Sequence, residues 1–276
     1  MKENYESWIG RSVTREDVVT PRLLAEYRAT LDPFLFNPVR DEICPPGLHW
    51  GLAPATPRMD ELGPDGSEAK GLFLPPIPLP RRMWAGGKVE TFGAIGVGMA
   101  VTRIATITDV KMREGKSGPL YFVSVTHEIK SGAELLVRER QDLVFGDGRP
   151  KVLATPAPVT RAKADLEWTV EPSVTLLFRF SALTFNAHRV HYDFPYATEN
   201  EGYGGLLVHG PLQAALLLNQ AAVAMGRVPG GFDYRCTAPL IAGAAATVTT
   251  RRKANGTAGR IVDHRGVITI EGFAFR

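Results

Sequence analysis

The sequence predicts an α+β fold in which a helix packs against a curled antiparallel sheet, an arrangement made twice along the chain. Two observations support this prediction. Each half contains a helical segment and several runs rich in β-branched residues, with glycine-containing turns between the runs. Residues 82–113 and 232–255 also share one order of parts, a short strand, a turn and a long strand that ends in basic residues. We interpret this as an internal duplication, although two β-rich halves without a common origin would give the same pattern.

The composition is that of a globular protein. The 276 residues include 44% hydrophobic and 22% charged side chains, which excludes disordered and fibrous proteins. A net charge of +3 and only short basic clusters argue against a nucleic-acid partner. The chain has no apolar run of about 18 residues and no apolar leader, so we expect no membrane partner. Cys44 and Cys236 form no disulfide framework, which favours a reducing, cytoplasmic compartment.

The first half is predicted to begin with an amphipathic helix. Thr20 and Pro21 supply a cap and a first-turn proline, and an apolar stripe follows at helical spacing as far as Leu31. Beyond a proline-rich region, three strand-like runs occupy residues 97–110, 120–129 and 134–145. Because glycine-containing turns separate these runs, we expect consecutive antiparallel hairpins.

The second half is predicted to open with a strand at 174–180. A polar segment leads from it to a helix that runs from Pro211 to about Met225 and is apolar on nearly every side. Since exposing one of its leucines to water would cost roughly 1.5–3 kcal/mol, other elements have to enclose this helix. Further strands are predicted at 232–238, 245–253, 260–263 and 266–275.

A group of prolines near the middle of the chain indicates a boundary between the halves. Pro150, Pro156 and Pro158 follow a glycine-containing segment and are accompanied by few large apolar residues, which is typical of an inter-domain linker. We therefore expect an N-terminal domain at 1–150, a linker at 151–165 and a C-terminal domain at 166–276.

The polar segment of the second half carries the candidate chemistry. His188 and His191 lie there with Asn186 and Asp193, and His209 directly precedes the apolar helix. Two histidines three positions apart can bind a metal or move protons. No recognised zinc spacing is present, so we favour proton transfer, for which imidazole titrates in the right range. One histidine that caps a turn, next to a second histidine that lies in the core with its hydrogen bonds made, would give the same pattern.

Gly210 is placed at the start of the apolar helix. The unpaired N–H groups and the positive dipole end at such a position can stabilise an oxyanion, and a glycine lets a substrate approach the backbone. A plain helix start, with Pro211 at its favoured position, would look the same.

These stretches resemble the MaoC-like, R-specific enoyl-thioester hydratases, and more closely their type-2 hydroxyacyl-thioester dehydratase branch, which includes mesaconyl-CoA and itaconyl-CoA hydratases. The matching residues are 78–87, 181–193 and 201–212, which together span most of the chain in order. The resemblance implies a double hotdog, with a degenerate first half and the hydratase motif in the second. It also implies a hydro-lyase that acts on an acyl-CoA without cofactor or metal. Hotdog domains usually pair, so the two halves pair within one chain or the chain forms a homodimer.

The wider family has the motif Asp-x-Asn-Pro-x-His, from which this chain departs. Aligning the last histidine on His191 puts Asn186 at the aspartate position, His188 at the asparagine position and Arg189 at the proline position. An amide cannot accept a proton as a carboxylate does. The resemblance therefore implies His191 or His188 as the base, with Asn186 orienting the water and Asp193 as a candidate substitute acid.

The resemblance also implies substrate contacts. Gly210 N–H would bind the thioester oxygen, and Arg82 would bind the free carboxylate of a short dicarboxylic acyl group. The other candidates are Arg81, Trp84, Arg179, Arg189, Tyr203 and His209. These arginines could instead bind the phosphates of CoA. Two other functions stay open, a thioesterase that uses Gln213 or Asn219 and a non-catalytic protein that binds acyl thioesters.

Overall fold

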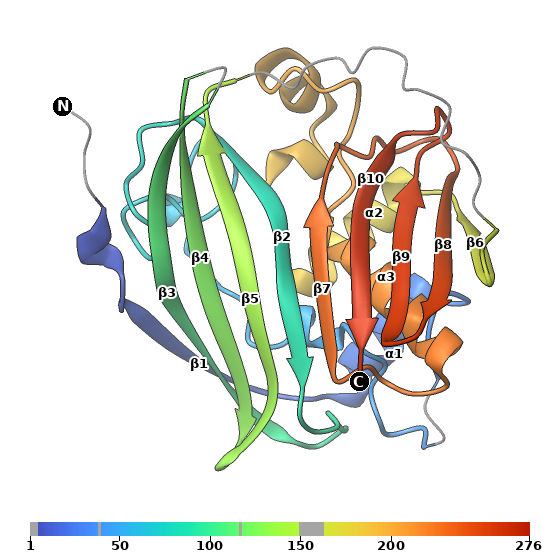
Figure 1. Ribbon diagram of the computed structural model, residues 1–276. Coiled ribbons are helices and arrows are strands. Elements are labelled where there is room, and N and C mark those ends of the chain that lie inside the picture. The colour runs from blue at the N-terminus through green and yellow to red at the C-terminus, as the bar shows by residue number, and fades with distance from the viewer. Residues whose placement is uncertain (1–4, 38–39, 116–117, 149–162) are drawn as a thin grey trace.

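The computed structural model describes residues 5–37, 40–115, 118–148 and 163–276. Within these ranges, ten strands form one continuous antiparallel sheet in the order β1-β3-β4-β5-β2-β7-β10-β9-β8-β6. The strands are β1 (Ser12–Val18), β2 (Arg81–Thr91), β3 (Ala100–Gly115), β4 (Gly118–Ser131), β5 (Glu134–Gly146), β6 (Leu166–Val170), β7 (Gly231–Cys236), β8 (Ala246–Lys253), β9 (Gly256–Val262) and β10 (Ile268–Phe275). In Figure 1 the helices lie behind the strands, on one face of the sheet.

Three α-helices and five short helical turns complete the described chain. The helices are α1 (Pro21–Leu31), α2 (Val174–Thr184) and α3 (Gly210–Met225). The short turns are η1 (Glu6–Trp8), η2 (Leu48–Gly51), η3 (Met59–Glu61), η4 (Arg189–His191) and η5 (Tyr196–Asn200). The predicted α+β class and the two hairpins formed by β3, β4 and β5 are confirmed. The four later strands predicted in the second half are also confirmed, as β7, β8, β9 and β10.

The two halves of the sheet meet where β2 pairs with β7. Gly87 lies opposite Tyr234 and Glu90 lies opposite Gly231 in this seam. A Cβ added at Gly86 would come within 2.4 Å of the Tyr234 carbonyl oxygen on β7, so a larger residue would force these two strands apart. Strands β1 to β5 and β6 to β10 are therefore halves of one sheet, and the predicted linker at 151–165 falls largely outside the described residues.

Helix α3 is enclosed by the second half, as its composition predicts. It packs on β8, β9 and β10, and its side chains are buried along nearly its whole length. The polar residues among them are all hydrogen-bonded, which removes most of the cost of burying them. Gln220, for example, donates to the Val248 carbonyl oxygen and accepts from the Thr250 hydroxyl.

The first half is covered differently. Helix α1, capped by the Thr20 hydroxyl, packs mainly on α2 and η2 rather than along the strands. The coil residues Ile77, Phe73 and Leu74 cover instead one end of the β3, β4 and β5 strands. They join a separate apolar cluster there, with strand residues from 105–110, 121–125 and 143–145. Among the described residues this half therefore has no counterpart of α3 in the middle of its strands, which leaves room for a cavity.

Residues 174–184 form a helix, so the strand predicted at 174–180 is wrong. The Ser173 hydroxyl caps the helix by accepting from the Leu176 N–H, and Leu177, Phe180 and Leu183 place one buried face at a spacing of three residues. A short, continuous apolar run cannot be assigned to helix or strand from periodicity alone, which explains the error.

Candidate active site

Three imidazole rings meet between α2 and the start of α3. Helix α2 ends at Phe185, which has a positive φ of 50°, and the chain then turns through η4. The rings of His188 and His191 are perpendicular, with centroids 5.6 Å apart. On its other side His191 stacks on His209 at 3.6 Å. The two motif histidines and the histidine before α3 thus form a single cluster.

The hydrogen bonds fix the roles available to each ring nitrogen. His191 Nδ1 lies 2.7 Å from the Leu207 carbonyl oxygen, which can only accept, so Nδ1 carries the proton and Nε2 has a free lone pair. His209 Nε2 lies 2.8 Å from the Ser181 hydroxyl. Asn186 Oδ1 accepts from the His188 backbone N–H, which leaves its amide nitrogen free.

Burial keeps these rings neutral. Desolvation lowers the pKa of His191 to about 4, and the hydrogen bond to Leu207 opposes this only in part. The pKa values of His188 and His209 are lowered well below 6.5 by burial and by the neighbouring rings. At neutral pH the cluster therefore offers unprotonated nitrogen, the form a general base requires.

One cavity of about 820 Å³ brings most of the predicted site residues together. His188, His191 and Asn186 line it with Gly210. The substrate-contact candidates that also line it are Arg81, Arg82, Trp84 and Tyr203. His209 is fully buried behind His191 and supports the ring instead of reaching the cavity. The side chain at 191 and the first amide of α3 therefore face one space.

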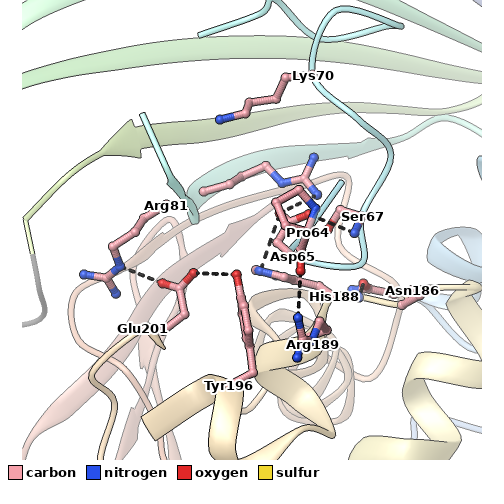
Figure 2. Close-up of polar contacts among 12 residues, drawn as sticks. Pro64, Asp65, Ser67, Lys70, Arg81, Asn186, His188, Arg189, Tyr196 and Glu201 are labelled. Carbon is pink, nitrogen blue, oxygen red and sulfur yellow. Dashed lines mark hydrogen bonds and ion pairs between the residues drawn. The ribbon is translucent and has the colours of Figure 1, made fainter. Parts of the chain in front are cut away.

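A carboxylate that the sequence analysis missed lies beside His188. Asp65, in the coil before β2, places Oδ2 3.8 Å from His188 Nε2 and 3.7 Å from Arg82 Nη2. Figure 2 shows Asp65 above His188 and Asn186, reaching over from the first half. His188 Nε2 is buried and has no hydrogen-bond partner among the described residues. Asp65 is thus the carboxylate that comes within ion-pair distance of this ring.

The loop that carries Asp65 is fixed to the motif by its backbone. The Arg189 N–H donates to the Asp65 carbonyl oxygen at 2.8 Å, and the Arg189 guanidinium donates to the Pro64 carbonyl oxygen at 2.9 Å. Gly66 has a φ of +80°, and a Cβ there would lie 2.2 Å from the Ala187 carbonyl oxygen. The Pro-Asp-Gly sequence indicates a turn, but nothing in it shows which segment the turn contacts.

Arg189 and Asp193 do not take the roles expected of them. Neither lines the cavity. Arg189 pairs with Asp193 at 2.8 Å and lies over the Tyr196 ring. The Tyr196 N–H and Arg189 hold the pKa of Asp193 below its usual range. Arg189 therefore holds the Asp65 loop instead of a substrate, and Asp193 stays ionised on the outer side of the turn, unsuited to act as the substitute acid.

Arg81 and Arg179 are also held by protein groups. Arg81 donates to Glu201 at 2.7 Å and lies over the Tyr203 ring, and Glu201 accepts from the Tyr196 hydroxyl (Figure 2). Arg179 donates to the Ala29 carbonyl oxygen. In the described part of the chain no group of three or more His, Cys, Asp or Glu side chains is arranged to hold a metal ion.

Comparison with known proteins decides the family. The profile of hydroxyacyl-thioester dehydratase type 2 matches residues 47–242. The chain belongs to the type-2 hydroxyacyl-thioester dehydratase family. It is 41% identical over 239 residues to a mesaconyl-C(4)-CoA hydratase of Chloroflexus aurantiacus, covering 86% of this chain and 85% of that one. It is therefore a hydro-lyase, as the motif stretches predict.

Solved structures show the same fold at low sequence identity. A MaoC-like dehydratase from Phytophthora capsici is 13% identical with a TM-score of 0.69, over 99% of this chain and 98% of that one. A Mycobacterium tuberculosis protein described as a double hotdog is 13% identical with a TM-score of 0.59, over 97% and 96% of the two chains. The predicted double hotdog is confirmed. None of the described helices is long and apolar enough to span a bilayer.

Proposed function

We propose that this dehydratase reversibly hydrates a short α,β-unsaturated acyl-CoA that carries a second carboxylate, of the mesaconyl or itaconyl type. The observation that carries the proposal is the shared cavity of His191 and Gly210, which has a neutral base at one side and helix N–H groups at the other. The relatedness to the mesaconyl-C(4)-CoA hydratase and the arginines of the cavity wall support the dicarboxylic substrate.

The reaction divides into a base step and an oxyanion step. His191 Nε2 takes a proton from water while the hydroxide forms a bond to the β carbon of the substrate. The electron pair of the double bond moves to the thioester oxygen, where the Gly210 N–H at the start of α3 stabilises the enolate. The enolate then collapses as the protonated His191 ring returns its proton to the α carbon, which completes the hydration and regenerates the base; the reverse order gives dehydration.

Asp65 has the position to act on His188. Its carboxylate favours the His188 tautomer with the proton on Nε2, which leaves Nδ1 with the lone pair, and it stabilises the ring when the ring gains a proton. We therefore propose that Asp65 supplies the negative charge that the motif lost when Asn186 replaced the aspartate. In this proposal Asn186 orients the attacking water through its free amide nitrogen.

The thioesterase alternative receives no support from α3. Gln213 lines the cavity, but its Oε1 accepts from Thr269. Asn219 donates to the carbonyl oxygens of Pro46 and Ala215 and accepts from the Phe36 N–H. Both amides therefore have structural partners. A cytoplasmic location and a homodimer stay predictions.

A panel of enoyl-CoA substrates tests the proposal. We expect loss of the enoyl absorbance with mesaconyl-CoA or itaconyl-CoA at a kcat/KM at least tenfold above that with crotonyl-CoA, which has no second carboxylate. Release of free thiol, measured in the same reactions, would show a thioesterase. Tight binding of every acyl-CoA without turnover would contradict the proposal and indicate a binding protein.

Substitution of Gly210 tests the placement of the oxyanion donor, because alanine keeps the backbone N–H but disturbs the packing around it. A Cβ at this position would lie 2.9 Å from the Trp84 ring, whose Nε1 donates to the Tyr234 hydroxyl. Gly210→Ala should therefore move Trp84 into the cavity and lower kcat/KM about tenfold or more, while the melting temperature falls only slightly. The control is Gly204→Ala, because a Cβ at Gly204 would meet no atom within 4 Å. Equal activity of the two variants would show that the contact between Trp84 and the start of α3 does not hold the oxyanion donor in place.

A further inference from the structure

A second polar group lines the same cavity on its first-half side. Arg103, His127 and Gln141 come from the neighbouring strands β3, β4 and β5, and all three are at least nine-tenths buried. The proposed proton transfer uses none of them. Buried polar groups of this kind are costly unless they are paired or bind a ligand.

The hydrogen bonds within this group leave one buried ring nitrogen without a partner in the described part of the chain. Arg103 Nε donates to His127 Nδ1 at 3.1 Å, so the proton of the neutral His127 ring is on Nε2. Burial and the charge of Arg103 lower the pKa of His127 well below 6.5 and keep the ring neutral. Gln141 lies beside this ring, but its amide nitrogen donates to Glu139 at 2.9 Å. His127 Nε2–H thus has no hydrogen-bond partner among the described residues.

Arg103 differs from the other arginines of the cavity wall. Three of the four wall arginines are within 4.0 Å of a carboxylate, in the pairs Arg15–Glu68, Arg81–Glu201 and Arg82–Asp65. In the described part of the chain no carboxylate oxygen lies that close to Arg103. Its Nη1 donates instead to the Leu52 carbonyl oxygen at 3.1 Å.

Glu139 on β5 is the acid whose charge acts on Arg103, although among the described residues its oxygens do not come within 4.0 Å of the guanidinium. Its two carboxylate oxygens accept from the Trp50 ring N–H at 2.7 Å and from Gln141. Burial raises the pKa of Glu139, and burial lowers that of neighbouring His49 to about 3, so no further cation forms there. The cation that faces the cavity from this wall with no acid in contact is therefore Arg103.

The group lies at a short reach from the proposed oxyanion site. Trp84 touches Gly210 and pairs with Leu143 on β5, and Gln141 is two residues further along the same strand face. Two residues along β5 at about 3.3 Å each, combined with one strand spacing of about 4.8 Å, put the Cα of Gln141 about 8 Å from the Cα of Trp84. A short acyl chain that starts at the oxyanion site and an extended Arg103 side chain that reaches from β3 can together span this distance.

We propose that Arg103, His127 Nε2–H and Gln141 form the subsite that binds the free carboxylate of the acyl group. This inference rests on the proposed hydratase function and assigns its selectivity for dicarboxylic substrates. The planar Arg103 guanidinium and the fixed imidazole N–H together match the two oxygens of a carboxylate. Arg82, the residue expected for this task, faces Asp65 at 3.7 Å, so a substrate carboxylate there would meet a like charge.

The test compares the ratio of kcat/KM for mesaconyl-CoA to that for crotonyl-CoA in a set of variants. Arg103→Met should lower this ratio at least about 30-fold, because the substrate carboxylate would be buried without its cation. His127→Phe, which keeps the ring but removes the donor, should lower the ratio about tenfold. Arg103→Lys, which keeps the charge without the planar fork, should retain part of the selectivity.

The control variant is Arg140→Met on β5, which removes an exposed arginine whose partner is Asp142 on the same strand. Its ratio should equal that of the wild type. An unchanged ratio in Arg103→Met would overturn the subsite. If Arg103→Met does not fold, an unchanged ratio in both Arg103→Lys and His127→Phe would overturn it. Loss of selectivity in Arg82→Met alone would do the same. Wild-type protein that hydrates no enoyl-CoA would instead refute the proposed function.

Discussion

Replacing His191 with alanine is expected to lower kcat for hydration about 100- to 10,000-fold, because the substitution removes the nitrogen that takes the proton from water. The backbone should keep its fold, since the bond that His191 makes through Nδ1 joins it to a loop carbonyl and not to a core element. The measurement is the decay of enoyl absorbance, together with the melting temperature. His264→Ala removes a histidine from the turn between β9 and β10 and should keep full activity.

The pH profile gives an independent check on this role. A base is active when unprotonated, and burial lowers the pKa of His191 to about 4, so kcat should stay constant from pH 7 to about 5 and fall near pH 4. The unfolded chain takes up protons on its histidines below about pH 6.5, which destabilises the folded state as the pH falls. Circular dichroism at each pH separates the two effects. A rate that already falls with a midpoint near 6.5 in folded protein would contradict a buried neutral base.

Asp65→Asn is expected to reduce kcat about 100-fold with little change in KM, because the amide keeps the shape of the loop but cannot hold the charge beside His188. The bonds between the loop and Arg189 come from backbone oxygens and should survive. Asp65→Glu should recover part of kcat, which a purely structural role would not explain.

Asp193→Asn is the matched control for the same substitution. Asp193 lies on the outer side of the turn, where it pairs with Arg189 and does not line the cavity. We expect its kcat to remain within about threefold of the wild type. A larger loss in Asp193→Asn than in Asp65→Asn would reverse the assignment of the acid.

The parts of the fold with a strong local pattern were predictable from the sequence. The apolar helix α3 and the hairpins of β3, β4 and β5 follow from periodicity and glycine turns. Helix α2 was not predicted because its apolar run is too short for the helical period to be distinguished from that of a strand. His188 and His191 could be found from the sequence because they lie close together within the motif stretch at 181–193.

Contacts between the halves could not be predicted in the same way. Asp65 meets His188, and Arg103 and His127 share a cavity with His191, only because the sheet closes through β2 and β7. No periodicity or spacing in a single chain carries this information. The turn at Gly66 was readable as a turn, but its docking site at Ala187 depends on the packed fold.

The seam between β2 and β7 makes the two halves of the sheet chemically unequal partners. The first half carries Asp65 and the second half carries the three histidines, so neither half holds the whole site. Mixing an impaired Asp65→Asn protein with an impaired His191→Ala protein should not raise turnover above that of the separate variants, since every chain retains one defect. Complementation would require two chains to exchange domains, so that the first half of one chain pairs with the second half of the other at the β2–β7 seam. Recovery of activity in such mixtures would therefore be a direct assay for domain exchange.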